Sequence, residues 1–292
     1  MDRRRVAQVM SFPAVSGLPQ PGRTLVIGVV NVTPDSFSDG GLWFESRDAI
    51  DHGLELINEG ADIVEVGGES TRPGADRPTV EEELRRVLPV VFELAATGAV
   101  VSIDSMRPEV VAQAVAAGAA MVNDVSGGRA DPAMLRLVAE LQVPYVCMHW
   151  RGHAAGMQNL AQYNDVVTEV VAELRQQISA ALSAGVAAER LIIDPGFGFA
   201  KTGEHNWQLL QRLGELSALS LPVLAGVSRK AFLGALLADS ESRPRQAKER
   251  DAATTALTTI LAGQGIWGVR VHSVRPNRDA IAVVTRLSQA AG

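Results

Sequence analysis

LIIDPGFGFAK, residues 191–201, joins a short apolar run to a carboxylate and a glycine-rich turn. The three branched residues before Asp194 predict a buried strand. Pro195 and Gly196 then end that strand, because neither residue continues a central ladder well. The stretch therefore places an acidic side chain at the carboxyl end of a strand. Taken alone, the same pattern is also typical of an aspartate that caps a turn between a strand and a helix.

The arrangement recurs along the chain, and the repetition predicts a parallel barrel. Expected strands lie at 25–30, 62–66, 100–103, 120–122, 145–148, 191–193, 222–225 and 266–271. Short buried strands that alternate with helices form parallel sheets, and eight such units favour a (β/α)₈ TIM barrel of the α/β class. A doubly wound open sheet is the alternative, but it would hold a ligand mainly at one crevice.

Helix signals separate the expected strands. Helices are expected at 46–59, 79–97, 107–117, 164–184, 204–216 and 250–262, with others after Asp131, after Ser228 and from Pro276. Ser46, Thr79, Asp131 and Ser228 are the expected N-caps, and Glu82 stands at capping-box spacing from Thr79.

Composition bounds the class of protein. The chain has 292 residues, with 27 basic against 33 acidic side chains and a formal charge of −6, which argues against a nucleic-acid partner. No uninterrupted apolar run is long enough to span a bilayer, so no membrane partner is expected. Cys147 is the single cysteine, which suits a reducing compartment, and we expect a cytoplasmic protein. Residues 1–22 read as an N-terminal tail and 23–292 as one barrel domain.

Polar side chains gather at the carboxyl ends of the expected strands. They are Asn31, Glu65, Asp104, Asn123, His149, Asp194, Ser228 and His272. In a barrel these positions meet on one face, where active sites lie. Two carboxylates, Asp104 and Asp194, could each accept paired N–H donors, as offered by a nitrogen heterocycle with an amino group beside a ring N–H.

Basic side chains complete the expected site. Arg72, Lys230, Arg270 and His272 form a cationic set in an acidic protein, which indicates an anionic ligand or leaving group. Each of these residues has a structural alternative when taken singly, such as a helix cap or a solvated charge. The shared position at strand ends is what favours function.

The sequence motifs of several other kinds of site are absent. The sequence contains no P-loop, no complete dinucleotide fingerprint and no HExxH motif. The histidines are too far apart in sequence to predict a zinc site, although barrel loops could bring His149 and His272 together.

Longer motifs resemble the dihydropteroate synthases, the folate-pathway enzymes that sulfonamides target. The resemblance rests on NVTPDSFSDGG (31–41), GGESTRPG (67–74), SID (102–104), NDVSG (123–127), DPGFGFAK (194–201), SRK (228–230) and RVH (270–272). It runs in order from about residue 26 to residue 272. It implies a barrel that joins 6-hydroxymethyl-7,8-dihydropterin diphosphate to 4-aminobenzoate, releasing diphosphate through a dissociative route with a pterin cation. It also implies Mg²⁺ as cofactor and a homodimer.

The resemblance implies a role for each matched residue. The pterin pocket would contain Asp104, Asn123, Asp194, Lys230, Met148 and Arg270, and the diphosphate would be held by Arg72, Arg270 and His272. The 4-aminobenzoate would lie among Thr71, Pro73, Phe199, Ser228, Arg229 and Lys230. Asn31 would bind Mg²⁺, and the catalytic residues would be Asp39, Arg72 and Lys230. One departure is Ala231, where several family members carry serine.

Two other functions stay open at this point. A pterin-dependent methyltransferase module could use the same barrel, but it has no reason to keep the diphosphate set. A non-catalytic paralogue could bind pterin or a partner subunit, but its loop motifs should be damaged, and here both loop motifs are intact.

Overall fold

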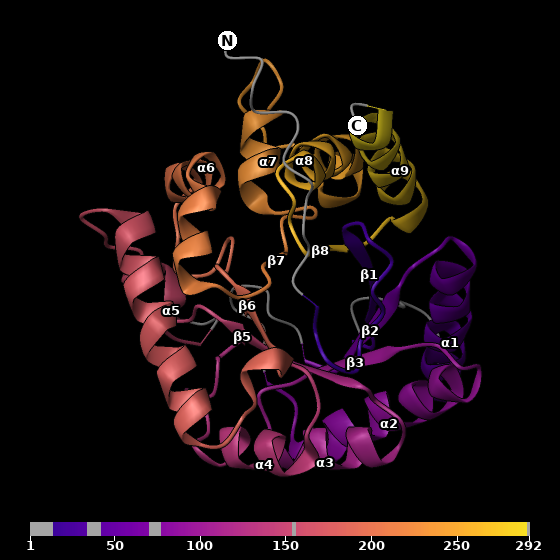
Figure 1. Cartoon of the computed structure of the whole chain (residues 1–292). Coiled ribbons are helices and arrows are strands. Elements are labelled where there is room, and N and C mark those ends of the chain that lie inside the picture. Colours follow the sequence, from indigo (N-terminus) through magenta and orange to yellow (C-terminus); the bar gives the residue numbers. More distant parts are fainter. Residues whose placement is uncertain (1–13, 34–41, 70–76, 154–155, 291–292) are drawn as a thin grey trace.

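Eight parallel strands form a ring with helices around it (Figure 1). The computed structural model of the protein describes residues 14–33, 42–69, 77–153 and 156–290. The strand order is β6-β5-β4-β3-β2-β1-β8-β7. A parallel bridge between Ile193 and Val223 joins the two ends of that order and so nearly closes the ring. The prediction of a (β/α)₈ barrel is confirmed.

The elements follow the expected order, with bounds that differ from the sequence-based ranges by a few residues. The strands are β1 (Leu25–Asn31), β2 (Ile63–Gly67), β3 (Val101–Asp104), β4 (Met121–Asp124), β5 (Tyr145–Met148), β6 (Leu191–Asp194), β7 (Leu224–Ala225) and β8 (Gly268–Val271). The helices are α1 (Leu42–Asn58), α2 (Val80–Ala96), α3 (Pro108–Ala116), α4 (Ala133–Leu141), α5 (Val166–Ser183), α6 (Gly203–Gln211), α7 (Ala231–Leu236), α8 (Asp251–Gly263) and α9 (Val274–Ala290). Short 3₁₀ helices lie at Met157–Leu160, Ala188–Arg190, Leu213–Leu219 and Ala247–Arg250.

Two apolar layers hold the barrel together. Successive side chains of a strand point to opposite faces, so most strands supply both layers. The outer layer fills the space between strands and helices, where Val64, Val66 and Ile103 lie. The inner layer fills the barrel interior near the amino ends of the strands. Its buried members are Val15, Leu18, Leu25, Ile27, Ile63, Met121, Val146, Ile192, Leu224 and Trp267.

The described part of the segment predicted as a tail, residues 14–22, lies against the barrel. Val15 and Leu18 are buried in the inner layer. The backbone N–H of Ser16 donates to the carbonyl of Glu189, at a distance of 2.9 Å. These residues therefore cover the end of the barrel opposite to the carboxyl ends of the strands.

The predicted helix caps have mixed outcomes. Thr79 is the N-cap of α2 and accepts the N–H of Glu82, as predicted, although the Glu82 carboxylate pairs with Arg85 and Arg86 instead of returning to the cap. Asp131 accepts the N–H of Ala133 at the start of α4.

Two predicted caps are wrong. Ser46 lies inside α1, which begins at Leu42. Ser228 does not cap α7, because Arg229 has a left-handed φ of 58° and the helix begins only at Ala231, with Lys230 as its N-cap. A residue with that φ cannot belong to the first turn of a right-handed helix.

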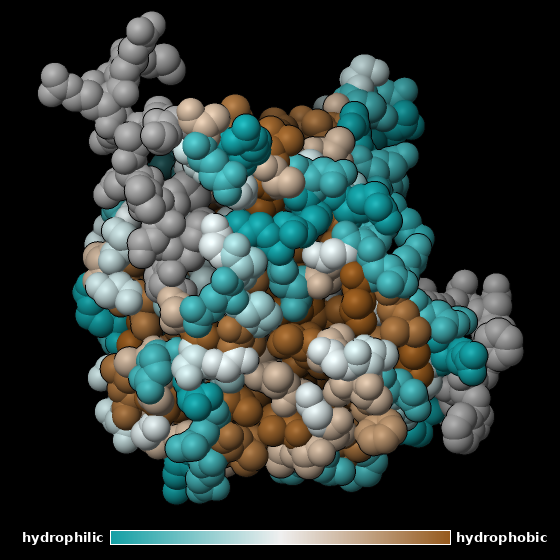
Figure 2. All heavy atoms as spheres, turned by 45° about the vertical axis from the view of Figure 1, so that its right-hand side comes forward, coloured by the Kyte–Doolittle hydropathy of each residue, from teal (hydrophilic) through white to brown (hydrophobic). Residues whose placement is uncertain are grey.

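The outer surface carries several large hydrophobic side chains. On α7, α8 and α9 they are Leu236, Ile260, Val283 and Leu287. Figure 2 shows hydrophobic side chains gathered across the middle of one face of the molecule. Among the described residues, no helix is both long enough and apolar enough to cross a membrane.

The inner layer makes a prediction for stability. Leu224→Ala removes a fully buried side chain from the barrel interior, so it should lower the free energy of unfolding by about 2–5 kcal/mol. Leu182→Ala is the matched control, since Leu182 on α5 is 45% exposed and the change should stay within about 0.5 kcal/mol. Urea denaturation of both variants measures the difference. Equal effects would show that the barrel interior contributes no more than the surface.

Candidate functional site in the barrel mouth

The site follows from the period of two along each strand. Two residues after each apolar side chain of the inner layer, the same strand presents a second inward side chain nearer to its carboxyl end. Glu65 follows Ile63 in this way, Asn123 follows Met121, Met148 follows Val146 and Asp194 follows Ile192. On β8, Arg270 follows Gly268, which has no side chain. The barrel interior is therefore apolar at its floor and mainly polar at its mouth.

Arg270 is at the centre of one buried cluster in the mouth. Its Nε donates to Glu65 Oε1, and its Nη2 donates to Asp104 Oδ2 at 3.0 Å. The other oxygen of Glu65 accepts Asn123 Nδ2 at 2.9 Å and Ser102 Oγ at 3.4 Å. Two residues predicted to line the pterin pocket, Asn123 and Arg270, thus meet at the Glu65 carboxylate, and a third, Asp104, joins them through Arg270.

Asp194 and Lys230 form the facing side of the mouth. Asp194 Oδ1 accepts the N–H of Gly196 at 2.7 Å. A methyl group at Gly226 would lie 3.6 Å from Asp194 Oδ2 and 3.9 Å from Arg270 Cδ. Glycine at this inward position therefore leaves room for about a methyl group beside the Asp194 carboxylate and the Arg270 side chain, which come from different strands.

Burial sets the protonation of these groups. It raises the pKa of Asp194 to about 6, against the opposing effect of the Gly196 N–H and of Lys230. It also raises the pKa of Asp104 to about 8, with the negative charge of Glu65 as the next cause. Burial lowers the pKa of Lys230 to about 8, and Arg270 acts in the same direction. The mouth therefore holds buried ionisable groups whose charged forms a polar ligand could stabilise.

The remaining predicted residues lie around these two groups. Met148 ends β5 and is 3% exposed. The Phe199 ring lies 4.3 Å from Lys230 Nζ, measured from its centroid, which is cation–π geometry. Ser228 Oγ lies 2.9 Å from His272 Nδ1, so both belong to the rim near β7 and β8. Asn31 is the last residue of β1 and is half-buried.

Arg229 is a predicted substrate-binding residue whose side chain points away from the barrel mouth. Its guanidinium makes two hydrogen bonds of 2.7 Å to the carboxylate of Asp251 in α8. Its backbone N–H also donates to Thr254 in the same helix. The structure therefore places this side chain between the turn and α8, where it fixes the turn. Asp39, Thr71, Arg72 and Pro73 lie outside the described residues.

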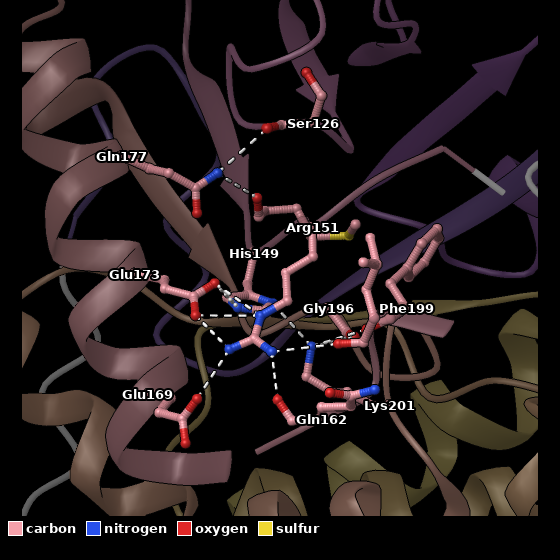
Figure 3. Close-up of polar contacts among 12 residues, drawn as sticks. Ser126, His149, Arg151, Gln162, Glu169, Glu173, Gln177, Gly196, Phe199 and Lys201 are labelled. Carbon is pink, nitrogen blue, oxygen red and sulfur yellow. Dashed lines mark hydrogen bonds and ion pairs between the residues drawn. The ribbon is translucent and has the colours of Figure 1, made fainter. Parts of the chain in front are cut away.

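Two polar residues at strand ends have partners that the sequence did not indicate. Glu65 was noted as a strand-end residue but given no role, and it proves to be fully buried beneath Asn123 and Arg270. His149 contacts Glu173 of α5 and Lys201, whereas His272 contacts Ser228 (Figure 3 shows the first group). The two histidines therefore do not share a site, and among the described residues no group of His, Cys, Asp and Glu could hold a metal ion by itself.

Comparisons with known proteins agree with this geometry. Residues 27–272 match the family model described as pterin binding enzyme. Dihydropteroate synthase of Mycobacterium leprae (strain TN) is 54% identical over 260 residues, which are 89% of this chain and 92% of that protein. The structure of Xanthomonas albilineans dihydropteroate synthase with 4-aminobenzoic acid has 44% identity and a TM-score of 0.85, over 95% of this chain and 98% of that one. The structure from the same organism with 7,8-dihydropteroate has 42% identity and a TM-score of 0.82, over 94% and 98%.

The chain therefore belongs to the family of pterin-binding enzymes. The mycobacterial relative and both solved structures are dihydropteroate synthases. Within the family, this chain is likewise one of the dihydropteroate synthases, which are transferases. The resemblance that the motifs indicated is confirmed.

The raised pKa of Asp194 predicts how stability depends on pH. Its value rises from 3.8 to about 6 on folding, so the folded state binds a proton more tightly, and this stabilisation is lost as the pH rises through that interval. Asparagine does not titrate. The ligand-free Asp194→Asn variant should therefore gain up to about 3 kcal/mol relative to wild type between pH 4 and pH 7.

Urea denaturation of both proteins at the two pH values measures this gain. Asp279→Asn, at an exposed position of α9, is the matched control and should follow wild type. A gain of the same size in the control, or none in Asp194→Asn, would contradict the expected burial effect.

Proposed function

We propose that the chain joins 6-hydroxymethyl-7,8-dihydropterin diphosphate to 4-aminobenzoate and releases 7,8-dihydropteroate and diphosphate. The observation that carries the proposal is the pairing of buried acceptors with cations in the barrel mouth, where Asp194 and Arg270 border the space above Gly226. The ligands named for the Xanthomonas enzymes, 4-aminobenzoic acid and 7,8-dihydropteroate, are a substrate and a product of this reaction.

The pterin ring suits the acceptors of the mouth. A pterin carries an amino group beside a ring N–H, and a carboxylate can accept both in two parallel bonds. Asp194 offers one oxygen that is not engaged by the Gly196 N–H, and Asn123 offers its amide oxygen because Glu65 takes its N–H. Because Asp194 and Asn123 are almost entirely buried, a ligand that supplies matching donors to these oxygens is bound specifically.

The reaction then needs charge stabilisation more than covalent help. In a dissociative route the bond from the pterin CH₂ to the diphosphate oxygen breaks first and leaves a pterin cation. The amine of 4-aminobenzoate then forms the new C–N bond and loses a proton. Arg270 and His272, with Arg72, would hold the departing diphosphate, while Asp39 would face the cation. Lys230 would bind the ring and help orient the second substrate with Phe199.

Magnesium fits the donors at the rim. Mg²⁺ prefers oxygen ligands, keeps several waters and is often bound through one protein side chain plus phosphate oxygens. Asn31, half-buried at the end of β1, offers an amide oxygen of this kind and would hold the ion. When bound, the ion would offset negative charge on the diphosphate as it leaves.

Diphosphate release tests the proposal. With Mg²⁺, release should depend on 4-aminobenzoate and match the dihydropteroate formed mole for mole, and chelation of Mg²⁺ should abolish it. Because sulfonamides share the aniline of 4-aminobenzoate, they should inhibit in competition with it. Pterin binding without turnover would instead support the paralogue, and no dependence on 4-aminobenzoate would contradict the proposal.

We also propose that the protein is a cytoplasmic homodimer. The buried free thiol of Cys147 suits a reducing compartment. The hydrophobic side chains on α7, α8 and α9 offer a surface for a second copy, since contiguous exposed apolar area is typical of interfaces.

A charge on α9 should weaken this dimer. Leu287 is 67% exposed, so Leu287→Arg should fold normally yet lower the mass measured by light scattering from twice the chain mass toward the chain mass. Leu182→Arg on α5 is the control and should stay dimeric. A monomeric wild type, or a dimeric Leu287→Arg variant, would contradict the use of this surface.

A further inference from the structure

The loop between β6 and α6 is built around one buried ammonium group. Lys201 is 3% exposed, and its Nζ donates to the carbonyls of Gly196 at 3.0 Å and Phe199 at 3.1 Å. Its third partner is His149 Nδ1, at 2.9 Å. A lysine ammonium has three N–H donors, so all of them are used inside the protein. Two loop carbonyls therefore turn inward, toward a charge instead of water.

The loop conformation needs such a centre. Gly196, Gly198 and Ala200 all have positive φ, of 69°, 79° and 47°. For Ala200 this left-handed region is unfavourable, because its Cβ lies too close to the following carbonyl oxygen. A methyl group at Gly196 would lie 2.4 Å from the carbonyl oxygen of His149, so the chain has no room to relax in that direction. The bonds from Lys201 offset this strain.

His149 holds the ammonium in place from the other side. As an ammonium, Lys201 can only donate, and in that state Nδ1 of His149 accepts and the ring proton is on Nε2. That nitrogen lies 3.0 Å from Glu173 Oε2 in α5. Burial lowers the pKa of His149 to about 4, in agreement with a neutral ring. In this tautomer the histidine bridges the Glu173 carboxylate and the Lys201 ammonium.

Arg151 is the outermost residue in this series of contacts, which runs from Lys201 through His149 and Glu173 to the surface of α5. Its Nε donates to both oxygens of Glu173, at 3.2 and 3.1 Å, and its Nη2 donates to Glu169 at 3.0 Å. Its guanidinium stacks 3.8 Å from the centroid of the Tyr163 ring. Figure 3 shows the series from Glu173 through His149 to Lys201 and the loop. The loop is thus tied to a long helix outside the barrel.

The series reaches the site through Phe199. Lys201 holds the carbonyl of Phe199, and the ring of Phe199 lies over the ammonium of Lys230 in the barrel mouth. We propose that Lys201, held by His149, is a positioning residue that fixes the β6–α6 loop so that Phe199 is set for 4-aminobenzoate. This inference rests on the proposed function. Lys201 itself need touch neither substrate.

Substrate-specific kinetics test the proposal. Lys201→Met keeps a stem of similar length but removes the donors, so the KM for 4-aminobenzoate should rise about tenfold or more, while the KM for the pterin substrate changes less than about threefold. Lys248→Met, at an exposed lysine, should leave both unchanged. Wild type without 4-aminobenzoate-dependent activity would sink the proposed function itself. Active wild type with equal KM shifts in Lys201→Met, or none, would overturn only this inference.

A double-mutant cycle separates positioning from general damage. If Lys201 acts through the Phe199 ring, then Lys201→Met should add less than about twofold to the 4-aminobenzoate KM of Phe199→Ala. Multiplicative effects would show that the lysine acts by another route.

Variants of His149 provide a second measurement should Lys201→Met not fold. His149→Gln can still accept from Lys201 and donate to Glu173, so it should keep a 4-aminobenzoate KM close to wild type. His149→Leu removes the acceptor and should raise that KM as Lys201→Met does. The reverse order of the two variants would overturn the proposal.

Discussion

The period of two along a strand, inside a nearly closed ring, is the constraint on which this site depends. Each strand can place only a few side chains in the interior, and those near its amino end are already needed for the apolar floor. The positions that remain for chemistry are the inward ones next to the carboxyl ends. Glu65, Asn123, Asp194 and Arg270 occupy such positions on four different strands. Groups far apart in sequence thereby share one small volume.

That volume holds more ionisable side chains than is typical of a protein core. Asp104 and Asp194 are nearly buried, and burial raises the pKa of both carboxyls. Arg270 bridges two carboxylates, which offsets part of the desolvation, and Asn123 is fixed by the same Glu65. The arrangement is typical of a site that is completed by its ligand, since the ligand supplies the donors that water supplies in the unfolded chain.

The sequence predicted well whatever depends on local pattern. Strand ends such as Asp194, and the Thr79 cap, could be read because the deciding residues are neighbours. Contacts between distant segments could not be read. Glu65 meets Arg270, which lies 205 residues further along, and no local signal marks that pair.

The start of α7 depends on a distant contact in the same way. Ser228 looked like a cap, but Arg229 takes a left-handed φ and pairs with Asp251 in another helix, which moves the helix start. The partners of Lys201 are likewise His149, just after β5, and carbonyls of its own loop, so no local pattern indicated a role for this lysine.

The pairing of β1 with β8 also has a consequence for how the chain is made. Leu25 is in register with Gly268, which lies 243 residues further along the chain. A ribosome adds roughly 5–20 residues per second, so β1 emerges on the order of 10–50 s before β8, the strand that pairs with its second edge. Until then β1 keeps an exposed hydrogen-bonding edge, and such edges recruit strands from other chains. The nascent, incomplete barrel is therefore more exposed to aggregation at the β1 edge than the closed one.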